Sequence, residues 1–194
     1  MTSLKPQNLT ECPAVEQPLV TFARLIREKI NVCEQLEHIA DRLPNQVNVD
    51  QCAKLAELLP DMLGLCDDIN QRVIFPLLLR HQSQRYFTHS MAQRLVDERM
   101  MDQGYALEVS ELLDQLAKAE SIRNAEASGY LLRSFFETVR RSSAFDLEYI
   151  VPMTRQYSTE RELGTIASML KRQRLIIDAS CISTRQALTS HRLH

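Results

Sequence analysis

The sequence predicts an all-α protein built mainly as one domain, and two observations lead to this prediction. Glycine occupies only 4 of 194 positions, whereas about 7% is usual, so the chain is poor in the residue that forms the tight turns of β-sandwiches and barrels. Its apolar residues recur at the three- and four-residue spacing of helices buried on one face. The chain also lacks GxGxxG and GxxxxGK sequences, so no Rossmann or P-loop phosphate site is indicated.

The first helix is predicted over residues 19–43. Pro44-Asn45 ends it, because proline cannot continue the hydrogen-bonding pattern of a helix. Residues 1–18 contain three prolines and scattered polar residues, and we expect them to form an irregular N-terminal arm. The apolar stripe of the helix consists of Phe22, Ile26, Ile30, Cys33, Leu36, Ala40 and Leu43.

The second helix is predicted to begin at Asp50, a residue type that favours the N-cap position. It continues to the polar connector at residues 81–85. Pro60 and Pro76 lie inside the apolar pattern, and each removes one intrahelical hydrogen bond, so we expect a kink or a break at each. The stripe consists of Leu55, Leu59, Met62, Cys66, Ile69, Val73 and Leu77.

Three further helices are predicted after the connector. The third covers about residues 88–119, and the fourth covers about 121–155 and is interrupted near its end by Pro152. Thr159 and Glu162 have the spacing of a capping box, which begins a fifth helix that runs toward Leu188. Short connections between long amphipathic helices are typical of a helical bundle. We therefore expect a four-helix bundle over residues 19–157 and a basic C-terminal helix, residues 158–194, packed on it.

The two predicted hairpins resemble each other. Glu28-Lys29 on the first helix corresponds to Glu98-Arg99 on the third. The second helix ends with VIFPLLLR at 73–80, and the fourth ends with YIVPMTR at 149–155. Lys29 precedes Pro76 by 47 residues, and Arg99 precedes Pro152 by 53. This internal repeat predicts two helical hairpins related by pseudo-symmetry about the long axis of the bundle.

These features resemble the hemerythrin-like family of cation-binding bundles over about residues 19–175. In that family each hairpin carries a Glu-His pair on its first helix, and its second helix carries HxxxE before an apolar-Phe-Pro end, for which IFPLLLR is the most specific match. The resemblance implies an up-down four-helix bundle followed by a basic helix, as in STERELGTIASMLKRQR at 158–174. The family's imidazole and carboxylate ligands hold a di-iron centre, a metal that suits them.

The metal ligands of the family are missing from this sequence. When the comparison is anchored on the two prolines, none of the six ligand positions carries a histidine, and Asp146 is the one good donor for a hard metal. The resemblance therefore implies a degenerate member that holds no iron or other cofactor. The six former ligand positions fall on Lys29, Cys66, Asn70, Arg99, Ser142 and Asp146.

Lys29 and Arg99 both fall on apolar stripes. Lys29 lies between Ile26 and Cys33 in the first helix. A buried cation without a partner is very costly. We therefore hypothesise that Lys29 and Arg99 occupy the former metal cavity, pair with Asp146 and neighbouring acids, and replace the metal ions as the positive centre. The alternative is that both side chains extend along an ordinary core to reach water.

Charge is unevenly distributed along the chain. The net charge is −2, which argues against a dedicated nucleic-acid binder. Residues 155–194 hold seven Lys/Arg and three acids, so they carry +4 and residues 1–154 carry −6. The C-terminal helix is therefore either a solvated basic surface or a docking face for an acidic partner. The candidate partner face consists of Arg161, Lys171, Arg172, Arg174 and Arg185.

The cysteine content and the hydropathy of the chain indicate a cytoplasmic protein. The five cysteines are odd in number and form no CxxC pair, so neither a disulfide framework nor a zinc knuckle is indicated. We see no signal peptide. No apolar run approaches the ~18–20 residues of a membrane span.

The function predicted from these features is that of a non-enzymatic regulatory or protein-interaction module. No arrangement of nucleophile and base can be inferred from the order of residues, and the oxygen, nitric-oxide and iron roles of the resembled family need a metal. A protein partner is expected, nucleic acid and membrane are not, and a homodimer is left open.

Two alternatives remain. One is a metal-dependent oxygen, nitric-oxide or iron sensor whose ligands have moved to His38, His81, His89 and Cys66. The other is a DNA-binding regulator that uses residues 158–190 as a helix-turn-helix.

Overall fold

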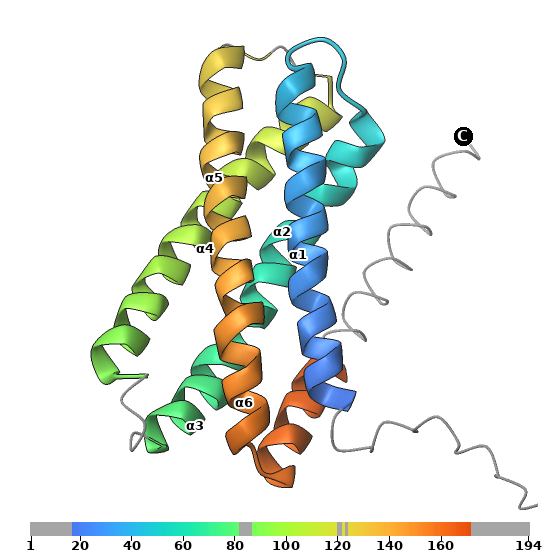
Figure 1. The fold of residues 1–194 in the computed structure, drawn as a ribbon. Helices are drawn as coiled ribbons and strands as arrows, with labels where there is room; N and C mark the ends of the chain where they lie inside the picture. Colours follow the sequence, from blue (N-terminus) through green and yellow to red (C-terminus); the bar gives the residue numbers. More distant parts are fainter. Residues whose placement is uncertain (1–16, 82–86, 120–121, 123, 172–194) are drawn as a thin grey trace, which may run out of the picture.

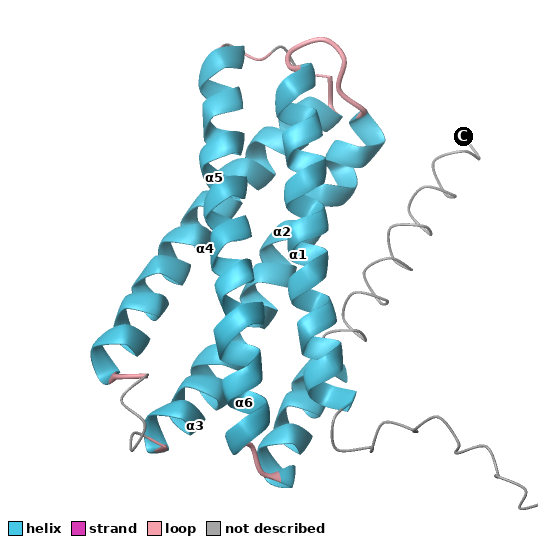
Figure 2. Cartoon of the chain, viewed as in Figure 1, coloured by secondary structure: helices cyan, strands magenta, loops and turns pink. Residues whose placement is uncertain are grey.

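The computed structural model is all-helical over the residues that it describes, 17–81, 87–119, 122 and 124–171 (Figures 1 and 2). The predicted fold class is therefore confirmed at the level of an all-α protein. No helix within these residues is both long and apolar enough to cross a membrane. The helices are α1 (Gln17–Arg42), α2 (Val49–Ile69), α3 (Phe75–Arg80), α4 (His89–Ala117), α5 (Ala125–Phe145) and α6 (Val151–Tyr157).

The long helices run up and down in alternation, side by side (Figure 1). α1 packs chiefly against α5, and α2 packs chiefly against α4. The contacts between α1 and α2, and between α4 and α5, are less extensive. The bundle thus consists of two closely packed helix pairs that face each other.

Helix starts are fixed by side-chain caps, which satisfy backbone N–H groups that have no partner in the first turn. Asn48 accepts a hydrogen bond from the Gln51 N–H at 3.1 Å and caps α2. The prediction of Asp50 as the N-cap was therefore wrong by two residues. Thr88 caps α4 in the same way. Asn124 caps α5, so this helix begins later than residue 121.

The prolines affect the backbone differently. α2 continues through Pro60 without a break, so of the kink or break expected there, the break does not occur. Pro76 is preceded by a π-helical turn, Asn70–Ile74, and Pro152 by another, Asp146–Ile150. A proline lacks the N–H group and clashes with the carbonyl four residues earlier. The wider π turn accommodates it, and the Phe75 and Val151 N–H groups bond to Asn70 O and Asp146 O.

A last helical stretch follows α6 at residues 160–171. One of the two bonds of the predicted capping box is confirmed, since Glu162 accepts a hydrogen bond from the Thr159 N–H at 2.8 Å. Glu162 also accepts one from the Thr159 hydroxyl at 2.5 Å. Glu162 also pairs with Arg80. Leu163, Ile166 and Leu170 are buried against the lower part of the bundle. The irregular arm was predicted over residues 1–18, but residues 17 and 18 belong to α1. Residues 1–16 and the predicted continuation of the last helix toward residue 188 lie outside the described residues.

Candidate functional site

A layer of buried charged side chains divides the core of the bundle. The upper apolar cluster contains Val32 of α1 and Ala106 of α4, whereas the lower cluster contains Ile26 of α1 and Ala92 of α4. Lys29 and Arg99 lie between these levels and are each 3% exposed. The predicted burial of both cations is thus confirmed. We call the following residues the charged layer: Lys29, Asp67, Arg99, Asp102 and Asp146.

Arg99 and Asp146 form the strongest contact in the charged layer. The Arg99 guanidinium donates from Nη2 to Asp146 Oδ1 at 2.6 Å and from Nη1 to Oδ2 at 3.1 Å. Asp146 is 0% exposed, and the π turn that it begins aims it into the core. Arg99 also lies 5.5 Å from the Phe75 ring centre. The pairing hypothesised for Arg99 is therefore observed, as a bidentate ion pair between α4 and the end of α5.

Asp67 joins the same network from α2. Its carboxylate lies 3.6 Å from Arg99 Nη1 and accepts a hydrogen bond from Gln103 Nε2 at 2.7 Å. Lys29 approaches from α1, and its charge acts on both Asp67 and Asp102. Sequence reasoning placed these acids only nearby in the chain and missed Gln103.

Burial perturbs the titration of these groups. It raises the pKa of Asp102 to about 6 from an ordinary 3.8, with the Lys29 charge opposing the rise. It also raises the pKa of Asp67, against the effects of Arg99 and Lys29. Burial would lower the pKa of Arg99, but the charge and hydrogen bonds of Asp146 outweigh it and raise that pKa. Arg99 therefore stays protonated, whereas burial disfavours the charged form of Asp102.

The other positions that the resemblance assigned to metal ligands, Cys66, Asn70 and Ser142, carry uncharged side chains. Cys66 is fully buried, and burial raises the pKa of its thiol to about 11. Asn70 is fully buried, and neither its Nδ2 nor its Oδ1 has a hydrogen-bond partner. Ser142 is half-buried and donates to the Val139 carbonyl at 3.1 Å. The neighbouring Ser143 is fully buried, with no partner for its Oγ.

These residues do not fit a di-iron centre. A guanidinium and an ammonium are donors without an acceptor lone pair, so Arg99 and Lys29 cannot serve as ligands in these forms. Asp146 is the most suitable metal ligand among them, but both of its carboxylate oxygens accept hydrogen bonds from Arg99. Over the described residues, no group of three or more His, Cys, Asp and Glu side chains is arranged to hold a metal ion.

The alternative ligands are not brought together by the fold. His38 of α1 is exposed, and His89 begins α4 at the opposite end of the bundle and is also exposed. His81 stacks on the Tyr157 ring, with ring centres 4.8 Å apart. Cys66 is enclosed in the core. No observation favours the relocated metal site.

The candidate partner face is described only in part. Arg161 and Lys171 are exposed on the last helical stretch. Arg172, Arg174 and Arg185 lie outside the described residues, as does most of the segment interpreted as a helix-turn-helix.

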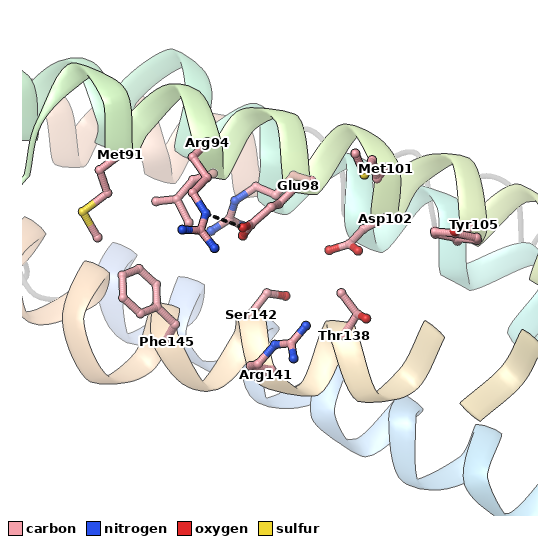
Figure 3. A pocket seen from close by; sticks show the side chains of 12 residues that line it. Met91, Arg94, Glu98, Met101, Asp102, Tyr105, Thr138, Arg141, Ser142 and Phe145 are labelled. Atoms are coloured by element: carbon pink, nitrogen blue, oxygen red, sulfur yellow. Dashed lines mark hydrogen bonds and ion pairs between the residues drawn. The ribbon is translucent and has the colours of Figure 1, made fainter. Parts of the chain in front are cut away.

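A groove between α4 and α5, which the sequence did not reveal, opens onto the charged layer (Figure 3). Its volume is about 770 Å³. Arg99 and Asp102 contribute to its lining, together with apolar side chains such as Met91 and Phe145. The groove lies on one of the two sides of the bundle where neighbouring helices make fewer contacts.

The fold and the charged layer define the class of this protein as an all-helical bundle with a buried ion-pair network. Comparison with protein-family models, curated proteins and solved structures finds no match.

Proposed function

We propose that the chain is a degenerate hemerythrin-like bundle in which buried charged side chains replace the metal centre, and that it acts as a non-enzymatic regulatory or protein-interaction module. The observation that carries this proposal is the Arg99–Asp146 ion pair at 2.6 Å, buried between two apolar clusters. The buried cations of the chain supply, at this level, the positive charge that metal ions would otherwise provide to the buried carboxylates.

The agreement between the two halves of the bundle supports the proposed relationship. Each half contains a π turn that begins six residues before its proline, with Asn70 before Pro76 and Asp146 before Pro152. Asn70 and Asp146 are both 0% exposed. The anchoring of the ligand positions on the two prolines is thus consistent with the backbone of both halves.

The interaction role rests on the last helical stretch. Arg161 and Lys171 are exposed there, while the apolar face of the same stretch is buried against the bundle. Exposed basic residues on an anchored helix suit an acidic protein surface, and such contacts govern association rate and specificity.

The absence of a metal centre is tested by metal analysis. The protein is purified without chelators from cells grown with added iron, and its metal content and visible spectrum are measured. We expect iron, manganese and zinc far below one ion per chain and no visible bands. One or two ions per chain would contradict the proposal, and His38, His81, His89 and Cys66 would be the first residues to substitute.

The interaction role is tested by capture from a lysate, with identification of the captured proteins. The charge reversals Arg161→Glu and Lys171→Glu, and deletion of residues 176–194, should each weaken capture of an acidic partner. Lys54→Glu is the matched control, because Lys54 is exposed on α2, away from this stretch. Equal capture by all variants would remove the proposed partner face.

A further inference from the structure

Asp102 is a buried carboxylate that points into the α4–α5 groove (Figure 3). Its residue is 6% exposed. Within the described part of the chain, the Asp102 carboxylate has no hydrogen bond and no ion pair within 4.0 Å, and the charge of Lys29 is the main one that opposes its own. A buried carboxylate without a donor is unfavourable. The Asp102 carboxylate is thus a hydrogen-bond acceptor that faces the groove.

Several donors close to Asp102 are directed to other acceptors. Arg99 directs both terminal nitrogens to Asp146. Across the groove, Thr138 and Ser142 of α5 donate to backbone carbonyls of their own helix. On the rim, Arg94 donates to Glu98 at 2.8 Å. The Arg99 Nε–H has no partner and Arg141 lines the α5 side of the groove, but within the described residues neither forms a hydrogen bond to Asp102.

Charge balance points in the same direction. The described residues include three buried carboxylates, Asp67, Asp102 and Asp146, and two buried cations, Lys29 and Arg99. Two minus three leaves the charged layer at −1 when all five groups are ionised. Asp146 and Asp67 have close partners, so Asp102 carries the charge that is least compensated.

The remaining walls suit an apolar molecule. Met91 and Phe145 lie toward one end of the groove, and Met101 and Tyr105 line it beyond Asp102 (Figure 3). Leu95 also lines the groove. Sulfur and aromatic groups of this kind pack adaptably on apolar and aromatic ligands. The volume of about 770 Å³ falls within the usual range of small-molecule sites, ~300–1,000 Å³.

We infer that this groove binds a small amphipathic amine whose ammonium group donates hydrogen bonds to the Asp102 carboxylate and whose apolar body lies along Met91, Leu95 and Phe145. Arg141 enters from the α5 side (Figure 3) and would accommodate an anionic substituent on such an amine. The inference goes beyond the proposed function and does not depend on it, because binding needs neither a protein partner nor the loss of a metal.

The test uses three probes of similar size and different charge: 2-phenylethylamine, 2-phenylethanol and 3-phenylpropionate. Their binding to the full-length protein is measured by calorimetry and by amide chemical shifts. We expect the amine to bind at least ~10-fold more tightly than the alcohol or the acid, since hydrogen bonds to a charged group are worth ~1.5–3 kcal/mol. Shifts should concentrate at residues 91–105 and 138–145.

Asp102→Asn should weaken binding of the amine by a similar ~10-fold factor. Asp114→Asn is the matched control, because Asp114 is an exposed carboxylate further along α4, and it should bind the amine as the wild type does. Three results would each overturn the inference: no binding of the amine at millimolar concentration, equal binding of the alcohol or the acid, or shifts away from the groove. The shift map needs no variant, so it decides the question even if Asp102→Asn fails to fold.

Discussion

Arg99→Met tests whether the charged layer is required for folding. Arg99 is 3% exposed, makes two hydrogen bonds to Asp146 and lies 3.6 Å from Asp67. The substitution introduces an apolar side chain of similar length and leaves Asp146 buried without its cation. Removing one partner of a buried ion pair costs ~3–5 kcal/mol. This is a large fraction of the ~5–15 kcal/mol by which a folded domain is usually stable.

The double variant Arg99→Met/Asp146→Leu separates the pair from its parts. Replacing both members of a buried pair with apolar residues is often neutral or stabilising by ~1–4 kcal/mol. We therefore expect the double variant to regain most of the stability that Arg99→Met loses. Asp67 retains its hydrogen bond to Gln103 at 2.7 Å, which limits the cost of leaving it near a methionine.

Stability is measured by urea unfolding at pH 7, followed by circular dichroism at 222 nm. Arg94→Met is the control, because the Arg94–Glu98 pair lies on the surface with side chains 81% and 50% exposed, and such pairs contribute only ~0–1 kcal/mol. If Arg99→Met were no more destabilising than Arg94→Met, the charged layer would not be required for the fold. If the double variant lost as much stability as Arg99→Met and Asp146→Leu together, the two charges would not be coupled.

Three further predictions follow from the same structure. The folded-state pKa of Asp102 is raised from 3.8 to about 6, so its ionisation should lower the free energy of unfolding as pH rises between these values, by up to ~3 kcal/mol at ~1.4 kcal/mol per pKa unit. Asp102→Asn should remove this pH-dependent loss of stability. A difference in the free energy of unfolding between wild type and variant that does not change with pH would refute the prediction. The thiols of Cys33 and Cys66 are buried with pKa values near 11, so native-state alkylation should be slow at both and fast in urea; equal rates, read by peptide mass spectrometry, would contradict this. Asn48→Ala should cost ~1 kcal/mol by removing the cap of α2, whereas Asp50→Ala should cost less; the reverse order would restore Asp50 as the cap.

The helices could be predicted because burial on one face produces a periodic pattern in the sequence. Their details depended on local competition that the pattern does not record. Asn48 and Asp50 are both residue types that favour the N-cap position, and in the structure Asn48 occupies it. A kink or a break was expected at Pro60, but α2 has no break there, because a long helix packed against α4 tolerates the loss of one hydrogen bond.

The charged layer could be predicted in part. Lys29 and Arg99 stand on apolar stripes, and this conflict between charge and position predicted burial together with an acidic partner. Which acid would pair with which cation depends on the spacing between helices, so the contribution of Asp67 and Gln103 could not be inferred. The groove was missed for the same reason, since it results from the limited contact between α4 and α5.

The two halves of the bundle differ where their backbones agree, and this difference determines the chemistry of the charged layer. Both π turns begin with a fully buried polar residue, but this residue is Asn70 in one half and Asp146 in the other. Asp146 neutralises Arg99, whereas the neutral Asn70 side chain has no hydrogen-bond partner. Lys29 acts on Asp67 and Asp102, and Arg99 acts on both of them as well as on Asp146, so two cations serve three carboxylates. Asp102, which lines the groove, is the carboxylate without a hydrogen-bond donor, so the asymmetry of the repeat directs the excess negative charge to the accessible side of the bundle.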